Sequence, residues 1–360
     1  MAKSAEYGLG DYAFPRGWFA VANSSELDRK PLSVHYFGQD MVLYRGASGR
    51  AVMLDAWCPH MGTHLGSGEN SATTRSETHM EDDNIRCPFH AWRFGADGVC
   101  NQIPYHDGPI PPQARVKSWH IEERYNIVFA WHDPEGLAPD YPLPDYPEWD
   151  DPSWIPWPEL DHLCDLQHPI EILDNMSDVA HLDHLHGSMN VLRYENEYDG
   201  YLLHQRQSAR LFQPLGQDEM VMTTLSGYVG PGLAFGQFLE IDARQFICVT
   251  PIDDGTCRMW QAGMVRSPSG VRDEAGRTYR EGLNHTFGNG LLRDGEIWAT
   301  KRPALKVMQM PSDGPFRQTR IWYSQFYNPR ARADEIVARV AGRHYAKNMP
   351  PYTAEAEAAE

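Results

Sequence analysis

Two short cysteine–histidine pairs constrain the fold and chemistry of this chain more than any other feature of its sequence. The first pair is Cys58 and His60 in CPH, and the second is Cys87 and His90 in CPFH. Both pairs lie in stretches that contain proline and glycine, which are typical of loops. Two thiols and two imidazoles on two such loops predict a metal centre, so the fold has to bring the loops together.

The ligand set predicts a Rieske [2Fe–2S] cluster, in which two cysteines bind one iron and two histidines bind the other. A structural zinc site is the alternative, because two cysteines and two histidines also suit tetrahedral Zn²⁺. A zinc finger usually groups cysteine with cysteine and histidine with histidine, whereas each pair here contains one of each. The mixed pairs favour the cluster and make the chain an electron carrier.

A second group of possible metal ligands lies in the stretch DNMSDVAHLDHLHG. Its members are acids and histidines in close succession, namely Asp174, Asp178, His181, Asp183, His184 and His186. Two histidines and one carboxylate on one face of an iron are the ligands of non-heme Fe(II) oxygenases, and the open positions admit O₂ and substrate. A polar helix face is the alternative, but a cluster in the same chain favours the metal site.

The spacing leaves two histidines as rivals for one ligand position. His181 and His184 lie close together on a regular helix. His181 and His186 are about 140° apart around an ideal helix, and they converge only where the helix ends or distorts. The residues alone therefore leave both possibilities open.

Length and charge limit the classes of protein to consider. A chain of 360 residues suggests two or three domains, and a hydrophobic content of 41% is ample for a sizeable core. The formal net charge of −17 argues against nucleic acid and against anionic membrane surfaces as partners. No apolar run is long enough for a membrane span, and the N-terminus lacks the apolar stretch of a signal peptide. These features, with the other four cysteines interpreted as buried thiols, predict a cytoplasmic protein.

The hydrophobic pattern divides the chain into a strand-rich part, a connector and a second part. The strand-rich part, about 16–131, contains the cysteine–histidine loops, and the proline-rich connector follows at 134–159. The second part is predicted to begin with a helix and to continue as strands, a helix, a last strand and a surface helix. The first helix is predicted at 170–182, and the strands that follow it at 201–212, 219–229, 243–252 and 256–265. The second helix is predicted at the end of 282–301, the last strand at 318–327 and the surface helix at 334–349.

The two motifs together resemble those of the Rieske non-heme iron oxygenases, terminal (α) component. The second motif reads Asn175-x-x-Asp178-x-x-His181-x4-His186. The chain is most similar to the 3-ketosteroid 9α-hydroxylase oxygenases, through stretches such as RGWFAVA, CPFHAWRFGADGVC, RDGEIW and DGPFRQTRIWYSQFY. The resemblance runs from about residue 14 to residue 330.

The resemblance implies which residues bind metal. The cluster would be bound by Cys58, His60, Cys87 and His90. His181 and His186 would bind a mononuclear Fe(II) together with Asp294 of RDGEIW, for which Glu296 is the rival carboxylate. His184 would then have no ligand role.

The resemblance also implies an assembly. Asp178 and Asn175 would be catalytic residues, and Asp178 would link a cluster histidine of one subunit to an iron histidine of the next. The subunits would form a C3 homotrimer, because the cluster approaches the iron only across the subunit interface in this family.

The implied fold is α+β. An all-β Rieske domain at 1–140 would precede a helix-grip (START-like) catalytic domain at 141–345, with a curved antiparallel sheet around a long helix. Residues 346–360 would form an acidic, disordered tail.

The implied function is that of the terminal oxygenase of a multicomponent system. Electrons from NAD(P)H would pass through a flavin/iron–sulfur reductase, and O₂ would hydroxylate a small hydrophobic polycyclic substrate, foremost a steroid. Desaturation or oxidative demethylation of another substrate is the alternative within this class. A non-catalytic Rieske electron carrier is the alternative outside it.

Two departures from the family pattern are visible, along with one feature, at Thr63, that agrees with the disulfide-free clusters of oxygenases. Residues 68–83 form a polar insertion between the two cluster loops, expected to be an extended hairpin loop. Thr63 stands where high-potential Rieske proteins have a cysteine that joins the loops by a disulfide, so a disulfide-free cluster is expected. Leu182, Asp183 and His184 follow the first iron histidine where the steroid hydroxylases tend to have aromatic residues, which predicts a more polar surrounding for the iron.

Overall fold

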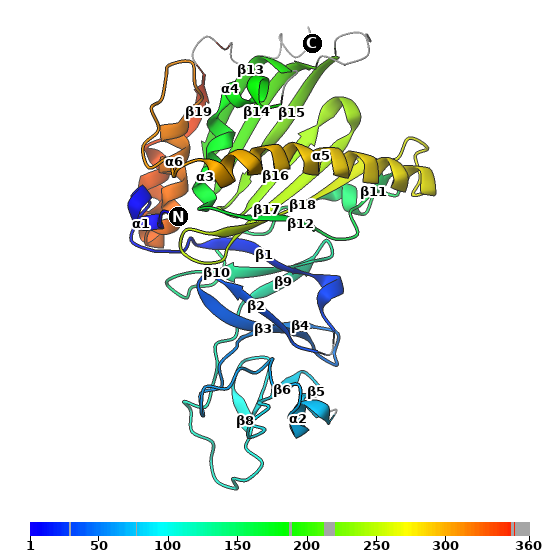
Figure 1. The fold of residues 1–360 in the computed structure, drawn as a ribbon, viewed down its shortest axis with the longest axis vertical. Coiled ribbons are helices and arrows are strands. Elements are labelled where there is room, and N and C mark those ends of the chain that lie inside the picture. The colour runs from blue at the N-terminus through cyan, green and yellow to red at the C-terminus, as the bar shows by residue number, and fades with distance from the viewer. Residues whose placement is uncertain (29, 77, 187–188, 212–219, 347–348, 350–360) are drawn as a thin grey trace. The chain divides into compact units, whose positions relative to one another are not determined.

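The computed structural model of this protein consists of two compact units (Figure 1). The smaller unit is Ala20–Trp131, and the larger unit combines Met1–Phe19 with His132–Glu360. The structure describes the chain apart from residues 29, 77, 187–188, 212–219, 347–348 and 350–360. The predicted acidic tail therefore lies, from residue 350 onwards, outside the described residues.

Short antiparallel sheets build the smaller unit. Strands β2, β3 and β4 form one sheet, β1, β10 and β9 a second, and β5 to β8 a third. The bounds are β1 Gly17–Asn23, β2 Leu32–Tyr36, β3 Gln39–Arg45, β4 Ala51–Asp55, β5 Met80–Glu81, β6 Asn84–Arg86, β7 Arg93–Phe94, β8 Cys100–Gln102, β9 Ile121–Arg124 and β10 Ile127–His132. The all-β architecture expected for the first part of the chain is confirmed.

The sequence of this unit explains how its strands pair and what they bury. Phe37 and Gly38 connect β2 to β3 with φ of 54° and 65°, and a two-residue loop with two positive φ angles matches the twist of a hairpin. Residues 41–44 of β3 are all buried. The same hydrophobic core includes Cys58 and Cys87, so the two loops are anchored to it through their cysteines.

An antiparallel sheet of nine strands dominates the larger unit (Figure 1). The strand order is β11-β18-β17-β16-β15-β14-β13-β19, and β12 also pairs with β18. The bounds are β11 Trp154–Ile155, β12 Asp161–Leu166, β13 Met189–Asp199, β14 Leu202–Leu211, β15 Met220–Val229, β16 Leu233–Phe238, β17 Ala243–Pro251, β18 Cys257–Arg266 and β19 Gly342–Tyr345. The helix α5 (Glu274–Thr300) crosses one face and packs on β11, β12 and β18. This is the predicted helix-grip arrangement.

The helix α5 is longer than its sequence suggests. The side chain of Asp273 accepts a hydrogen bond from the backbone N–H of Gly276 (2.8 Å) and so caps its first turn. Four glycines, at 282, 288, 290 and 295, lower the helix propensity of its middle. Only the end of the helix was therefore predicted, and the packing of Asp294 and Trp298, both buried, supports the rest.

The prediction of a strand at 318–327 is wrong. Most of the segment belongs to the helix α6 (Phe316–Ser324), which a short 3₁₀ turn follows. Its aromatic and β-branched residues favour strands when propensity alone is considered. However, Thr319, Trp322 and Tyr323 are buried, and their spacing is that of one face of a helix.

Other segments are partly as predicted. The surface helix predicted at 334–349 is correct for α7 (Ala333–Ala338), after which the chain adds β19 to the edge of the sheet. The sequence did not predict β13 or β16. The strand β13 carries Glu195 and Glu197 at alternate positions, so its sequence lacks the apolar run that marks a buried strand.

A buried histidine ties the N-terminal helix α1 (Ser4–Tyr7) to the rest of the larger unit. His168 is 2% exposed, its Nδ1 accepts the backbone N–H of Ile170 (3.2 Å), and its Nε2 lies 2.9 Å from Ser4 Oγ. Because Nδ1 is an acceptor, the proton is on Nε2, which donates to the serine. Burial lowers the pKa of His168 from 6.5 to about 4, so the ring is neutral at pH 7.

We expect His168 to make the larger unit sensitive to mild acid. Its pKa is about 4 in the folded protein and 6.5 in the unfolded chain, so its contribution to stability is complete above pH 6.5 and is lost as the pH falls towards 4. The loss between pH 7 and pH 5 is about 2 kcal/mol. His168→Asn should lack this part of the loss when the urea-unfolding midpoints of both proteins are compared at the two pH values. An equal pH dependence in the two proteins would contradict the argument.

Among the described residues, no helix combines the length and the apolar composition that crossing a membrane requires.

Candidate metal centres

The first cysteine–histidine loop is a tight turn that follows β4. The backbone N–H of Cys58 donates to the carbonyl of Thr63 (2.9 Å), and the N–H of Gly62 donates to the carbonyl of Cys58 (2.9 Å). Gly62 has a φ of 69°, a left-handed conformation that glycine adopts without strain. The turn buries Cys58 in the core and leaves His60 exposed.

The second loop, between β6 and β7, repeats this backbone pattern. The N–H of Cys87 donates to the carbonyl of Trp92 (2.8 Å), and the N–H of Ala91 donates to the carbonyl of Cys87 (2.9 Å). Ala91 stands where the first loop has glycine, and its φ is 57°. A left-handed alanine costs roughly 1–2 kcal/mol, so contacts around the second loop have to stabilise it.

The two loops bring the four predicted cluster ligands together. The thiols of Cys58 and Cys87 are buried and hydrogen-bond to each other. The ring centroids of His60 and His90 are 4.8 Å apart. The Nδ1 of His90 is buried, and in the described part of the chain no group hydrogen-bonds to it. A buried nitrogen without a partner is costly, and an iron ion would satisfy it.

Hydrogen-bond donors surround the two sulfur atoms. The backbone N–H of His60 faces the sulfur of Cys58, while the backbone N–H of His90 and the hydroxyl of Thr63 face that of Cys87. The hydrogen bond from Cys58 lowers the pKa of Cys87 to about 6, and the same pairing, with burial, raises the pKa of Cys58. Donors of this kind stabilise thiolate ligands and the clusters that they hold. The residues therefore fit a [2Fe–2S] cluster.

The larger unit contains a second group of side chains placed to hold a metal ion. It consists of His181 in α4 (Val179–His184), His186 just beyond this helix, and Asp294 in α5. All candidate ligand atoms lie within 4.8 Å of one another. The Nε2 atoms of His186 and His181 are 3.5 Å and 3.9 Å from the Asp294 carboxylate oxygens. Two imidazoles and one buried carboxylate fit a mononuclear Fe(II) whose other positions stay open.

The position at which α4 ends explains why His186, and not His184, lies beside His181. The helix ends at His184, and beyond it the ring of His186 comes within 5.4 Å of the His181 ring, measured between centroids. His184 and Glu296 are both exposed. The structure therefore brings His186 and Asp294 to His181 and leaves both rivals outside the group.

Two other residues singled out in the sequence hold these candidate ligands in position. The Nδ2 of Asn175 donates to Oδ1 of Asp294 (3.0 Å). Asp178 caps α4, because its Oδ1 accepts the backbone N–H of His181 (3.2 Å). The Asp178 carbonyl also accepts from Nδ1 of His181 (2.5 Å), which leaves Nε2 of that histidine free for a metal.

The turn Asp174–Ser177, which precedes α4, is anchored to its surroundings residue by residue. Asp174 pairs with Arg320, and Asn175 hydrogen-bonds to Asp294. The carbonyl of Met176 accepts hydrogen bonds from Asn196 and Gln205, and the hydroxyl of Ser177 hydrogen-bonds to that of Thr319. These bonds break the helix predicted at 170–182 into α3 (Pro169–Leu173), a 3₁₀ turn and α4. Sequence reasoning missed Arg320, Asn196 and Gln205, because they are far apart in the chain and follow no motif.

Two models of known families match the chain. A model described as Rieske [2Fe-2S] domain matches residues 17–120, and one described as 3-Ketosteroid 9alpha-hydroxylase C-terminal domain matches residues 130–327. The first match contains both cysteine–histidine loops, and the second contains the group of His181, His186 and Asp294.

Relatives with curated names are similar over most of the chain. The oxygenase component of a 3-ketosteroid-9-alpha-monooxygenase from Rhodococcus rhodochrous is 29% identical, over 95% of this chain and 90% of the relative. The component of the same name from Mycobacterium tuberculosis is 28% identical, over 87% and 82%. A cholesterol 7-desaturase from Caenorhabditis elegans is 35% identical, over 87% of this chain and 77% of its own.

Solved structures share the fold. Dicamba monooxygenase with non-heme iron and dicamba has a TM-score of 0.58 at 18% identity, over 91% of this chain and 96% of that one. NdmA of Pseudomonas putida CBB5 with caffeine has a TM-score of 0.62 at 15% identity, over 93% and 97%. At these identities the similarity concerns the fold alone.

A Rieske domain joined to a helix-grip domain with a two-histidine, one-carboxylate site defines the terminal component of a Rieske non-heme iron oxygenase, an oxidoreductase. The chain belongs to the 3-ketosteroid 9α-hydroxylase family, whose C-terminal domain model covers more than half of it. The predicted resemblance is confirmed, and the cofactors are a Rieske [2Fe–2S] cluster and a mononuclear iron.

Proposed function

We propose that this protein hydroxylates a ring carbon of a steroid, using O₂ and electrons that a separate reductase takes from NAD(P)H. The observation that carries the proposal is the presence, in one chain, of the paired cysteine–histidine loops and of a buried two-histidine, one-carboxylate group. The relatives named as 3-ketosteroid-9-alpha-monooxygenase oxygenase components support the steroid. An oxygenase component also implies a reductase as its partner.

Each cofactor would be held by the residues described above. Cys58 and Cys87 would bind one iron of the cluster, and His60 and His90 the other. The mononuclear iron would be bound by His181, His186 and Asp294. When bound, the cluster supplies single electrons and the mononuclear iron supplies O₂ activation.

The chain's own contribution is to orient these ligands and to limit access of water. Asn175 holds one carboxylate oxygen of Asp294, and the carbonyl of Asp178 fixes the tautomer of His181. Asp294 is 4% exposed. A ligand set held in this way needs little rearrangement when it binds metal and substrate.

We also propose that three copies form a C3 trimer in which the cluster of one subunit serves the iron of the next. In and beside the two cysteine–histidine loops, several large apolar side chains are exposed, namely Trp57, Met61, Phe89 and Tyr105. An exposed apolar surface of this kind suits a protein contact. Asp178 is only partly buried at the start of α4, so its carboxylate could meet a cluster histidine of the neighbouring subunit.

We expect Asp178→Asn to keep both metal centres and to slow turnover by about 10–100-fold. An amide can still cap α4, but it lacks the charge that would link the two histidines. Iron content and the EPR spectrum report the metals, and single-turnover oxidation of the reduced cluster reports the electron transfer. The matched control is Asp183→Asn, an exposed carboxylate of the same helix. Normal electron transfer in Asp178→Asn would rule out the link.

The sheet face beside the iron ligands supports a hydrophobic substrate with a polar group. A row of paired residues crosses this face, namely Tyr194, Gln207, Thr224, Phe238 and Ala243. At one end Tyr194 packs with Val179 of α4, and further along Phe238 stacks on Phe287 of α5 at 4.7 Å. Within the described residues, the buried Oε1 of Gln207 has no hydrogen-bond partner. It is therefore available to a substrate hydroxyl.

One relative favours desaturation as a second candidate function. The protein named cholesterol 7-desaturase is 35% identical, whereas the monooxygenase components compared above are 28% and 29% identical. The same ligand set could serve both reactions, since each begins with an aliphatic C–H bond. The outcome depends on how the substrate lies, so the reaction has to be read from the product.

A substrate screen tests both candidates. The protein is incubated with a surrogate reductase and with 3-ketosteroids, sterols and small aromatic compounds, and products are identified by mass. Gain of one oxygen indicates hydroxylation, and loss of two hydrogens indicates desaturation. Products from a monocyclic aromatic compound alone would end the steroid proposal.

Iron analysis separates an oxygenase from an electron carrier, with about three irons per chain expected for the oxygenase and about two for the carrier.

We retain two further expectations as proposals. In the sequence, the boundary between the Rieske domain and the catalytic domain would lie near residue 140. The protein would act in the cytoplasm. The free thiols of Cys100, Cys164, Cys248 and Cys257 are compatible with a reducing compartment.

A further inference from the structure

The second cluster loop needs support that the sequence motif does not provide. Its Ala91 has a left-handed backbone, and Thr63 replaces the cysteine that could have joined the two loops. Cys58, Cys87 and the neighbouring Cys100 are all free thiols, so none of them joins the loops through a disulfide. Other contacts must therefore hold the loops, and these come from the insertion 68–83.

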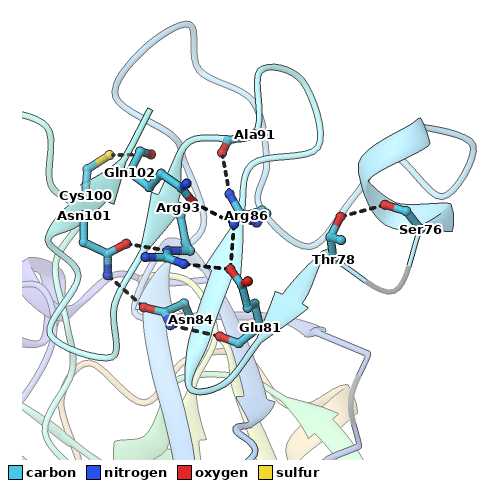
Figure 2. Close-up of polar contacts among 10 residues, drawn as sticks. All are labelled: Ser76, Thr78, Glu81, Asn84, Arg86, Ala91, Arg93, Cys100, Asn101 and Gln102. Atoms are coloured by element: carbon cyan, nitrogen blue, oxygen red, sulfur yellow. Dashed lines mark hydrogen bonds and ion pairs between the residues drawn. The ribbon is translucent and has the colours of Figure 1, made fainter. Parts of the chain in front are cut away.

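Glu81 of this insertion joins the two ends of the second loop (Figure 2). Its Oε2 accepts from Nη2 of Arg86 (2.6 Å) and from Nη1 of Arg93 (2.7 Å). Arg86 immediately precedes Cys87, and Arg93 immediately follows the residue that closes the turn. The Nη1 of Arg86 also donates to the carbonyl of Ala91 (3.4 Å). One carboxylate thus ties both ends of the loop and its left-handed residue.

Polar side chains of the neighbouring strands complete this arrangement (Figure 2). Arg93 Nε donates to Asn101 Oδ1 (2.7 Å), and Asn101 Nδ2 donates to Asn84 Oδ1 (2.8 Å). Asn84 Nδ2 then donates to the carbonyl of Glu81 (2.9 Å). The chain of bonds returns to the residue from which it began, so the carboxylate and both arginines have defined positions. The arginines lower the pKa of Glu81, which keeps it ionised.

His79 of the same insertion connects the second loop to the first. Its ring is buried, and Nε2 donates to the carbonyl of Leu65 (2.9 Å), at the end of the first loop. Its own carbonyl accepts the backbone N–H of Arg86 (2.8 Å). Gly68, at the start of the insertion, lies so close to the second loop that a Cβ there would be 2.9 Å from the side chain of Pro88.

We propose that the insertion is a noncovalent clamp that holds the two cluster loops together, and that Glu81 is a positioning residue for the cluster. The insertion was expected to be an extended hairpin loop. It contains a short helical turn, α2 (Ala72–Arg75), and it ends in a hairpin in which β5 pairs with β6. The clamp acts through Arg86 and Arg93, without contact between Glu81 and the predicted ligands. It does not depend on the substrate, so its failure would leave the proposed function untouched.

The charges in the clamp make a prediction for the reduction potential. Reduction adds one negative charge to the cluster. Two arginines and one glutamate near the second loop leave a net positive charge, and loss of Glu81 would leave both arginines uncompensated. Because a neighbouring positive charge stabilises the reduced form, Glu81→Gln should shift the potential of the cluster to a more positive value.

The experiment compares holoprotein variants by redox titration followed with EPR, and by the rate of cluster loss to a chelator. Glu81→Gln should raise the potential and speed cluster loss by roughly tenfold, the factor that corresponds to one charge-assisted hydrogen bond. Glu81→Asp should recover part of both effects. Asp82→Asn is the matched control, because it removes the same charge from the adjacent position but keeps the ion pairs of Glu81 with Arg86 and Arg93. It should leave the rate of cluster loss as in the wild type and change the potential less than Glu81→Gln does. If Glu81→Gln and Asp82→Asn gave the same potential and the same rate of loss, the positioning role would be overturned.

A second variant separates the link between the loops from the effect of charge. Burial lowers the pKa of His79, so its ring is neutral and His79→Leu removes no charge. This variant should speed cluster loss and change the potential less than Glu81→Gln does. A wild-type rate of cluster loss in His79→Leu would show that the insertion does not clamp the loops.

Discussion

Replacement of Asp294 by alanine will remove the mononuclear iron and abolish turnover while the Rieske cluster remains. Asp294 provides the only carboxylate in the described group of His181, His186 and Asp294, and its oxygens lie 3.5 Å and 3.9 Å from the two imidazole nitrogens. Without it, two imidazoles would have to hold Fe(II), which prefers an oxygen ligand on the same face. Iron analysis should show the loss of about one iron of about three per chain. The visible and EPR spectra of the cluster should be unchanged.

Two matched control variants and one variant with an intermediate effect accompany this result. His184→Ala and Glu296→Ala should keep both metals, because these exposed side chains lie outside the group. Asn175→Ala should lower the affinity for iron by about 10–100-fold, since it removes only the hydrogen bond to the ligand carboxylate. If His184→Ala emptied the site and His186→Ala did not, the proposed ligand set would be wrong.

The sequence could predict the cluster because its proposed ligands are local. Each cysteine–histidine pair lies within one turn, and the backbone bonds that shape the turn join Cys58 to Thr63 and Cys87 to Trp92. Residue types and spacing therefore carry most of the geometry. What they do not carry is the support of the loops from outside, since Glu81 and His79 lie in a polar insertion without any motif.

The iron group was less predictable, for a physical reason. Spacing on a regular helix favours His184 as the neighbour of His181, and only the end of α4 brings His186 to it. That helix begins at Val179, capped by Asp178, because the preceding turn is fixed by side chains such as Arg320, from distant parts of the chain. Family resemblance, not periodicity, chose between the two histidines.

The errors in secondary structure have the same origin. Local propensity favours a strand at 318–327, but burial of Trp322 and Tyr323 on one face and the ion pair of Arg320 with Asp174 stabilise a helix. Propensity also disfavours the glycine-rich middle of α5, which packing on the sheet stabilises. In both segments tertiary contacts outweigh local preference.

The second large effect is expected for Cys87→Ala, which should abolish the Rieske visible and EPR signature. The thiol is buried, hydrogen-bonds to that of Cys58 and receives donors from the backbone around it. No other residue of the loop offers a thiolate at this position, so a single substitution leaves one iron with one protein ligand. His60→Cys should have the same effect, because it replaces an imidazole on the other iron.

Cys100→Ala is the matched control for the loss of the cluster. Cys100 is a buried thiol of the same hydrophobic core, and its Sγ donates weakly to the carbonyl of Gln102 (3.6 Å). Its substitution should keep the cluster signature. The larger unit has hydrophobic clusters of its own, such as the one around Val249, Met259 and Trp298, so Cys87→Ala should still bind the mononuclear iron. A Rieske signature that survived Cys87→Ala but not Cys100→Ala would mean that the second thiolate ligand comes from β8.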